Sequence, residues 1–333
     1  MNTQDFIATQ EIRLDKFLAI QLNQSRNQIE QLIKKGFVKL ENKIVTKTSS
    51  KLYLNQKIYV TIPEIKQKSY EIEDSPWYDK VEIIYEDEYI LVINKPSGVI
   101  IHDAPSVNEP TLVDWLKKKG ISLSTISGEE RHGIVHRLDK GTSGVLVVAK
   151  SNDAHQKLSK QLEDKTMGRY YLAVIDIPLK QDIIVEQPIA RGQNNRLKMG
   201  IVPSGKYAKT AFKKLIENKH TQDNSKKYEL ITAKLFTGRT HQIRVHLESL
   251  NRHILGDALY GFKGNDASIK RIYLHAYCLY LVHPFTNKNM QFVASVPEDM
   301  DILISTNFDK ESIDEKINKE FITNSFNDMD SWM

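Results

Sequence analysis

Apolar side chains recur at helical spacing in two stretches near the start of the chain. The two stretches contain Leu14, Phe17, Leu18 and Leu22, and then Ile29, Leu32 and Ile33. Each set lies on one face of a helix. Ser25 and Gln28 fit a capping box before the second stretch, and Gly36 stands where a left-handed C-terminal cap is expected. The pattern therefore predicts two short helices.

Short β-type runs follow these helices, at residues 37–40, 43–45 and 57–62. Two helices and small strands predict a compact unit of about 60 residues. Pro63 and the polar stretch to Pro76 mark its end. We therefore expect a small domain over residues 1–72 and a linker over residues 73–80.

From Val81 onward the chain is rich in β-branched and aromatic runs. These predicted strands are residues 81–87, 89–95, 144–150, 170–176, 228–236, 241–247 and 271–283. One helix is predicted at Asn152–Thr166, from a stripe of Ala154, Leu158 and Leu162. Many strands with few helices predict an α+β domain over residues 81–300 with a mixed, mainly antiparallel sheet. Residues 301–333 form an acidic tail with a weak helical pattern, which we expect to be partly disordered.

Length and composition narrow the class of protein. A chain of 333 residues is long for one domain, and 40% hydrophobic residues can build a sizeable core. The apolar run at residues 144–149 is far shorter than the roughly 20 residues that span a bilayer. The single cysteine, Cys278, cannot form an internal disulfide, and no secretory signal pattern is present. We expect a cytoplasmic protein, monomeric and not bound to a membrane.

The net charge of +5 is unevenly distributed. Residues 301–333 hold three lysines and eight acidic residues, whereas residues 1–72 hold twelve basic and seven acidic ones. A basic surplus on a small domain favours a polyanionic partner such as nucleic acid. A solvated, lysine-rich surface would give the same count, so charge alone leaves both interpretations open.

The densest polar cluster lies in residues 131–150, next to a strand that the pattern predicts to be buried. His136, Arg137, Asp139, Thr142 and Ser143 fall within eight positions. Polar groups beside a core must bond to one another or lose free energy on burial, and loops on rigid sheets often carry catalytic groups. The alternative is a turn stabilised by an Arg–Asp pair.

A second cluster lies at residues 235–247. Read as a strand, it places Arg244 on the face opposite Ile243 and Val245, where a guanidinium would orient a nearby carboxylate and keep it ionised. A surface strand with ordinary ion pairs is the alternative. A third segment places Tyr171 near Arg169 on a strand, which is also compatible with plain core packing.

Several common sites lack support. The chain has no G-x-x-x-x-G-K-[ST], G-x-G-x-x-G, H-E-x-x-H or G-x-S-x-G motif. These absences disfavour nucleotide hydrolysis, dinucleotide binding, a zinc protease site and a hydrolase elbow. We expect neither a metal nor a cofactor.

The nine residues 136–144, H-R-L-D-K-G-T-S-G, resemble the active-site signature of the RluA-type RNA pseudouridine synthases. Further segments resemble the same family in order, at residues 94–99, 169–171, 237–246, 254–261 and 274–284. Arg169 replaces the lysine that the family often has there. Residues 12–62 resemble the small RNA-binding module shared by ribosomal protein S-four and tyrosyl-tRNA synthetase, although Asn55 and Gln56 replace a frequent Gly-Asp. This combination resembles the branch that modifies large-subunit (23S) ribosomal RNA.

The resemblance implies isomerisation of uridine to pseudouridine without a cofactor. It implies that Asp139 is the catalytic aspartate, that Arg244 pairs with it, and that Tyr171 packs against the uracil. Attack at C1′, attack at C6 and a glycal route all stay open. Residues that would contact RNA are His136, Arg137, Thr142, Arg239 and His241, and in the first module Arg13, Lys16, Arg26, Lys34 and Lys35.

Three other functions remain possible from the sequence. The same chemistry could act on tRNA, or the chain could be an RNA-binding ribosome-assembly factor. A glycosidase would need two carboxylates at the scissile bond, and the Asp139 loop supplies one, while Asp257 lies far away in the sequence.

Overall fold

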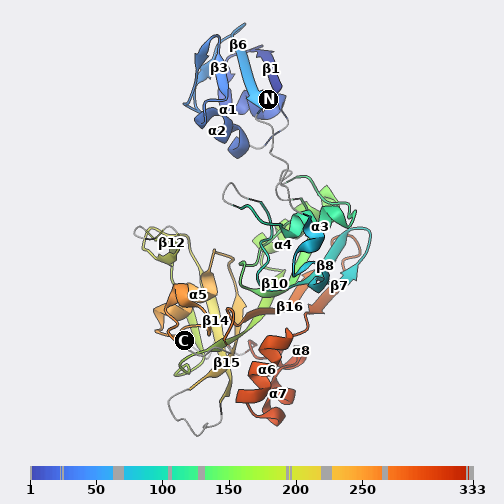
Figure 1. The fold of residues 1–333 in the computed structure, drawn as a ribbon, viewed down its shortest axis with the longest axis vertical. Coiled ribbons are helices and arrows are strands. Elements are labelled where there is room, and N and C mark those ends of the chain that lie inside the picture. Colours follow the sequence, from blue (N-terminus) through green and yellow to red (C-terminus); the bar gives the residue numbers. More distant parts are fainter. Residues whose placement is uncertain are drawn as a thin grey trace. The chain divides into compact units, whose positions relative to one another are not determined.

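The computed structural model describes residues 2–22, 24, 26–62, 71–103, 107–126, 132–192, 195, 197–218, 227–264, 269–327 and 329. Contacts between Cα atoms divide the chain into two compact units (Figure 1). The first lies within residues 1–70, and the second contains residues 71–126 and 130–333.

The first unit has a four-stranded antiparallel sheet of order β1-β6-β3-β4 and two helices. Its elements are β1 Asn2–Ile7, β2 Ile12–Arg13, α1 Leu14–Gln21, α2 Arg26–Lys34, β3 Val38–Leu40, β4 Lys43–Ile44, β5 Lys51–Leu52 and β6 Lys57–Ile62. Leu18 of α1 and Ile33 of α2 are fully buried in one core with Val60 of β6. The two predicted helices are confirmed, whereas the sequence pattern did not reveal β1.

Gly36 ends α2 in the predicted left-handed conformation, with a φ of 79°. The N–H of Gly36 donates to the carbonyl of Ile33, and the N–H of Phe37 donates to the carbonyl of Leu32. This pair of bonds satisfies carbonyls that the helix end leaves free. The predicted Ser25–Gln28 capping box lies outside the described residues, because Ser25 is not among them.

The second unit contains most of the regular structure. Its elements are η1 Ile72–Asp74, η2 Tyr78–Lys80, β7 Glu82–Glu86, β8 Ile90–Lys95, α3 Leu112–Lys118, β9 Ser143–Ala149, α4 Asn152–Glu163, β10 Gly168–Ile175, β11 Ile183–Glu186, β12 Ile189–Arg191, β13 Met199–Ile201, β14 Lys209–Glu217, β15 Glu229–Leu235, α5 Gln242–Ser249, η4 Ala258–Tyr260, β16 Leu274–Val282, β17 Asn289–Val293, α6 Glu298–Asn307, α7 Lys310–Lys316 and α8 Lys319–Asn324.

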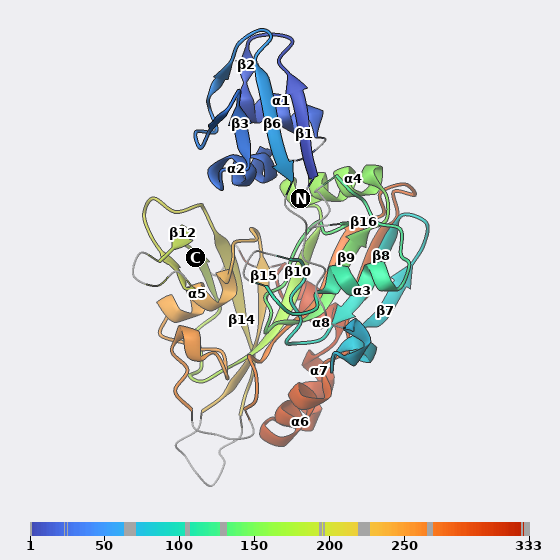
Figure 2. The ribbon, with the colours of Figure 1, turned by 45° about the horizontal axis from the view of Figure 1, so that its top comes forward.

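A nine-stranded sheet forms the centre of this unit, in the order β11-β14-β15-β10-β16-β9-β8-β7, with β17 added beside β16. Strands β16 and β9 run parallel, and the other neighbours described in this sheet run antiparallel. The predicted α+β fold with a mixed, mainly antiparallel sheet is therefore confirmed. Figure 2 shows α3 and α4 near β8 and β9, α5 beside β14, and α6, α7 and α8 grouped together.

Strands β9 and β10 are buried along their whole length, which explains their continuous apolar runs. Gly144 lies where β9 begins to pair with β16, with a φ of 118°. A Cβ atom there would stand 2.2 Å from the carbonyl oxygen of Ala276. Glycine thus permits the close approach of the two strands directly after the Asp139 loop.

The predicted strand at residues 241–247 is wrong, because Gln242–Ser249 forms helix α5. His241 precedes the helix in a left-handed conformation, with a φ of 57°. Residues 242–247 of α5 are all buried, whether apolar or polar. Ile243 lies in the main core, while Gln242 and His246 bond to Thr210 of β14. An alternation of polar and apolar residues usually indicates a half-exposed strand. Here the same alternation belongs to a helix that other elements cover on several sides.

The segments before and after the nine-stranded sheet contain more regular structure than the sequence predicts. Residues 73–80, predicted as a linker, form the turns η1 and η2, and Trp77 packs against the main core. The expected loose tail contains α6, α7 and α8. Ile304 of α6 and Ile322 of α8 are buried, and so is Phe326, which follows α8. Acidic residues on the exposed faces mask the apolar spacing of these helices in the sequence. Among the described residues, no helix is long and apolar enough to cross a bilayer.

Asp15 is the one fully buried carboxylate in the described part of the first unit. Its oxygens accept hydrogen bonds from the guanidinium of Arg13, at 2.9 and 3.1 Å, from Arg26 at 2.7 Å and from the N–H of Lys16 at 2.9 Å. Chiefly because of the bonds from Arg13, which outweigh burial, the pKa of Asp15 falls to about 2.

We predict that Asp15→Asn destabilises the first unit by about 1–3 kcal/mol, because two guanidinium groups lose their buried acceptor. In the wild-type chain this stabilisation is present above the ordinary pKa of 3.8 and is lost as the pH falls through about 2. Hydrogen exchange of the full chain checks this prediction. Peptides from residues 14–34 lose protection in the variant, and peptides from residues 145–175 do not; equal protection in both proteins would contradict it.

Candidate active site

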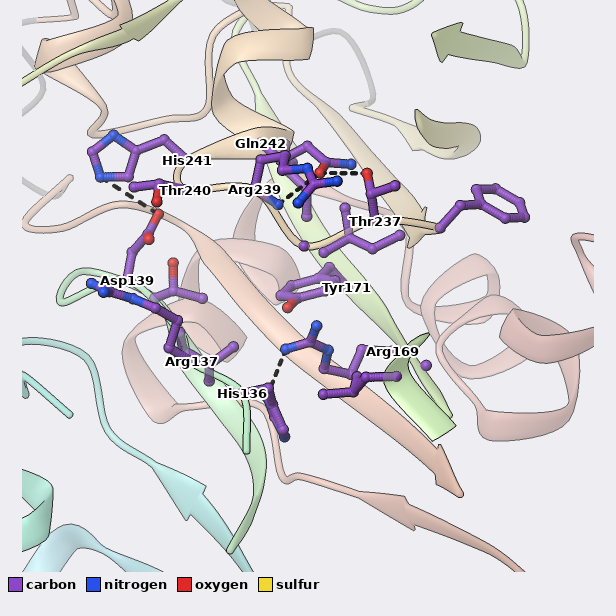
Figure 3. Close-up of a pocket in the computed structure, with 18 of the residues that line it drawn as sticks. His136, Arg137, Asp139, Arg169, Tyr171, Thr237, Arg239, Thr240, His241 and Gln242 are labelled. Carbon is purple, nitrogen blue, oxygen red and sulfur yellow. Dashed lines mark hydrogen bonds and ion pairs between the residues drawn. The ribbon is translucent and has the colours of Figure 1, made fainter. Parts of the chain in front are cut away.

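A cavity of about 540 Å³ lies in the second unit. Its walls are the loop before β9, the first half of β10, the turn between β15 and α5, and part of β16 (Figure 3). All the catalytic and RNA-contact residues predicted for this unit line it, namely Asp139, Arg244, Tyr171, His136, Arg137, Thr142, Arg239 and His241. The structure therefore brings together residues that are up to about a hundred positions apart in the sequence.

Backbone hydrogen bonds hold the Asp139 loop on two sides. The N–H of Thr142 donates to the carbonyl of Asp139 at 3.0 Å, and the N–H of Gly98 donates to the carbonyl of Lys140 at 2.7 Å. The hydroxyl of Ser97 donates to the carbonyl of Gly141 at 2.8 Å. The side chain of Asp139 is 18% exposed, so a fixed backbone presents a partly accessible carboxylate to the cavity.

Arg244 bridges two carboxylates. Its Nε and Nη2 donate to both oxygens of Asp257, at 2.6 and 2.8 Å, while its Nη1 lies 3.4 Å from Oδ2 of Asp139. The side chains of Arg244 and Asp257 are 5% and 1% exposed. A two-point bond of this kind fixes the plane of the guanidinium. Asp257 thus orients Arg244, and the third corner of the guanidinium points to Asp139.

The sequence pattern did not reveal the part played by Asp257. Its segment, residues 254–261, resembles the family, but its pairing with Arg244 spans thirteen positions and depends on the fold of α5. Both oxygens of Asp257 accept bonds from Arg244 in a buried site. Asp257 is therefore a structural partner of Arg244 and is not placed as the second carboxylate of a glycosidase.

Lys95, at the end of β8, is a second residue that the sequence pattern did not reveal. It is fully buried, and its Nζ donates to the carbonyls of Pro96 and Val99, at 2.9 and 3.0 Å. Burial lowers the pKa of Lys95 to about 7, although the charge of Asp139 favours its protonated form. Lys95 holds the 96–99 turn that in turn bonds to the Asp139 loop.

Of the three described histidines that line the cavity, His136 and His241 have a pKa below the usual value, which favours their neutral form. Burial, followed by the nearby charge of Arg169, holds the pKa of His136 well below its usual value. The Nε2 of His136 accepts the N–H of Val147 at 3.1 Å. Burial also lowers the pKa of His241, which lies 3.9 Å from Asp139 and 2.8 Å from the hydroxyl of Tyr260. Arg244 is thus the permanently charged partner of Asp139.

Tyr171 and Arg169 project from the same face of β10 toward the cavity. Tyr171 is 4% exposed, and burial raises the pKa of its phenol, so the ring is neutral at physiological pH. Nη1 of Arg169 lies 2.6 Å from Nδ1 of His136. The Nε of Arg169 is buried without a hydrogen-bond partner among the described residues.

The lining of the cavity is strongly basic. Of the described residues that line it, Asp139 is the one acidic residue, and six are Lys or Arg, which are Arg137, Lys165, Arg169, Lys234, Arg239 and Arg244. Such a wall favours an anionic ligand with several phosphates. Among the described residues, no group of three or more His, Cys, Asp or Glu side chains is placed to hold a metal ion.

The five cations predicted to contact RNA in the first unit all have exposed side chains. Arg13 and Arg26 both bond to Asp15, which brings them together between β2, α1 and α2. Lys34 pairs with Glu30 at 3.2 Å on α2. Asp15 therefore organises two of the five charges, although both guanidinium groups stay more than half exposed.

The neutral state of His136 can be tested directly. In an NMR titration of histidine-labelled protein, we expect its ring signal to stay that of neutral imidazole down to a pH well below 6.5, because burial opposes the charged form. The His136→Gln variant assigns the signal. A titration midpoint of the His136 signal at or above pH 6.5 would show that the ring is more exposed to solvent than the structure indicates.

Comparison with known proteins agrees with the site. The family model described as RNA pseudouridylate synthase matches residues 89–249, and the S4 domain model matches residues 12–58. An RNA pseudouridine synthase of Helicobacter pylori is 45% identical over 96% of this chain and 98% of its own length. The ribosomal large subunit pseudouridine synthase D of Zymomonas mobilis is 37% identical over 91% of this chain and 97% of its own.

The fold also has a counterpart among solved structures. The human RNA pseudouridylate synthase domain containing 4 protein superposes with a TM-score of 0.51 and 23% identity, over 66% of this chain and 90% of its own. At this level of identity, the likeness concerns the fold alone.

Proposed function

Since the chain belongs to the RNA pseudouridine synthase family, we propose that Asp139 is its catalytic carboxylate and that its substrate is large-subunit ribosomal RNA. The enzyme is an isomerase: the bond from N1 of uracil to C1′ breaks, the base turns, and C5 becomes attached to C1′. C5 then loses its proton and N1 takes up a proton, so substrate and product have the same composition. The observation that carries the assignment is the partly exposed Asp139 at a basic cavity, 3.4 Å from a buried guanidinium.

The chemistry of Asp139 suits this reaction. A carboxylate can add to an electrophilic carbon or stabilise positive charge that develops on the sugar. Among the described residues that line the cavity, Asp139 is the one that carries a carboxylate, so we propose it for either role. Both roles need the carboxylate held at a fixed distance from the target nucleotide.

Arg244 and Tyr171 support Asp139 in different ways. Arg244 places a permanent positive charge beside the carboxylate and, through Asp257, keeps that charge in one orientation. Tyr171 offers a buried, neutral ring at the wall of the cavity, which suits packing against the uracil face.

The target base must leave its stack to reach Asp139. This step costs roughly a few kcal/mol and is easiest for an unpaired loop nucleotide. Basic residues of the wall other than Arg244 supply contacts for the phosphates on either side of the flipped nucleotide. Arg137, which is exposed at the cavity, and Arg239 are the contacts we propose on the two opposite loops.

The ribosomal target rests on two observations. One relative that covers nearly the whole chain is named a ribosomal large subunit pseudouridine synthase, and the first unit matches the S4 domain. We propose that Arg13, Lys16, Arg26, Lys34 and Lys35 of that unit contact phosphates of the same RNA.

A pseudouridine map of total RNA tests target and residue together. Cells without the protein are complemented with wild type or with Asp139→Asn. We expect sites in large-subunit ribosomal RNA to vanish and to return with the wild type alone, because the amide cannot serve as a carboxylate. Missing sites in tRNA would contradict the proposed target. An unchanged map with a growth defect that Asp139→Asn rescues would indicate an assembly factor instead.

The Arg244 contact makes a separate prediction. Arg244→Lys keeps the charge but loses the two-point bond to Asp257, so we expect the single-turnover rate to fall about 100-fold, and further in Arg244→Ala. Glu248→Gln, on the same helix but paired with Lys198, is the control and keeps the wild-type rate. Tritium release from RNA labelled at C5 of uridine measures all three variants. Full activity of Arg244→Ala would mean that another residue is the partner of Asp139.

A further inference from the structure

A short segment before β16, residues 271 and 272, packs against Gly256 on one side and against Gly141 on the other. On one side, a Cβ atom at Gly256 would lie 1.8 Å from the carbonyl oxygen of Arg271. The backbone of Gly256, the residue directly before Asp257, therefore packs closely against the backbone of Arg271. On the other side, a Cβ atom at Gly141 would lie 3.0 Å from the Cδ1 atom of Ile272. Residues 271 and 272 thus separate the Asp139 loop from the residue that precedes Asp257.

The guanidinium of Arg271 reaches the same loop. Its Nη1 donates to the carbonyl of Ile272 at 3.0 Å and lies 3.5 Å from the hydroxyl of Ser143. Ser143 is fully buried, begins β9 and bonds to Nδ1 of His275 at 3.0 Å. Arg271 therefore contacts the strand end from which the Asp139 loop emerges.

Asp299, in the first turn of α6, holds this guanidinium. Its two oxygens accept Nε and Nη2 of Arg271, at 2.5 and 2.9 Å. Burial alone would raise the pKa of Asp299, but the bonds from Arg271 lower it overall. The helix itself is anchored independently, because Met300 and Ile304 are buried in the second core.

We propose that Asp299 is a positioning residue for catalysis: by fixing Arg271, it sets the separation between the Asp139 loop and the Asp257–Arg244 pair. The Asp139–Arg244 contact of 3.4 Å is longer than either bond to Asp257, so it is the contact that small shifts of the loop change most. Helix α6 thus acts on the site through the Asp299–Arg271 ion pair. The inference rests on the proposed catalytic role of Asp139.

The test compares two aspartates of the same turn. Asp299→Asn removes the acceptor of Arg271, while Asp301→Asn removes an equal charge from an exposed position. With enzyme in excess over an RNA that the wild type modifies, we expect Asp299→Asn to lower the single-turnover rate about 10-fold and to leave the Kd for RNA within about twofold. Asp301→Asn keeps both values, and Asp299→Glu recovers part of the rate.

A double variant separates positioning from a general loss of structure. If Asp299 acts through Arg271, Asp299→Asn combined with Arg271→Met is no slower than Arg271→Met alone. A further loss in the double variant, a wild-type rate in Asp299→Asn, or a weaker Kd with an unchanged rate would each overturn the proposal.

Hydrogen exchange over residues 298–307 reports whether α6 stays folded in these variants. Should α6 lose protection in Asp299→Asn, Met300→Ala loosens the same helix without touching Arg271. An equal rate loss in Met300→Ala would then overturn the proposal, and a wild-type rate would support it. An RNA that the wild-type enzyme leaves unmodified would count against the proposed substrate and not against Asp299.

Discussion

The second unit depends on one buried guanidinium. Arg244 is held out of water by the fold, and an unpaired charge in such a place costs several kcal/mol. Asp257 offsets that cost with two short bonds, and the remaining corner of Arg244 faces Asp139. The close packing at Gly256, the turn held by Lys95 and the burial of α5 all keep this arrangement in place. Asp139, the proposed catalytic carboxylate, is thus positioned by contacts to which the proposal gives no chemical role of their own.

Local sequence patterns predicted much of this fold because the forces behind them are local. The stripe of apolar residues in α4 and the left-handed Gly36 depend on a few neighbouring residues. The long apolar runs of β8, β9 and β10 reflect burial on both faces. The Asp139 loop was predicted for a related reason, since polar residues beside a buried strand need partners. Its resemblance to a known family then supplied the chemistry.

Features that depend on distant partners were not predicted. The alternation in α5 resembled a strand because its polar side, with Gln242 and His246, is satisfied by β14 and not by water. Asp257 and Lys95 lie in segments that are distant in the sequence from the Asp139 loop, and only the folded structure places them next to it. The same holds for the C-terminal helices, where Phe326 packs against Tyr170 of β10. In each case the stabilising contact joins elements that lie far apart in the sequence. A local pattern of apolar and polar residues cannot indicate which distant element will be the partner.

The most direct measurement is the single-turnover yield of pseudouridine from Asp139→Asn and Asp257→Asn, with RNA binding measured in parallel. The account predicts that both variants bind RNA as the wild type does. It predicts that Asp139→Asn forms no product, whereas Asp257→Asn forms product slowly because Arg244 has lost its orientation and not its charge. Product from Asp139→Asn at a rate equal to or above that of Asp257→Asn would contradict the assignment of Asp139 as the catalytic carboxylate.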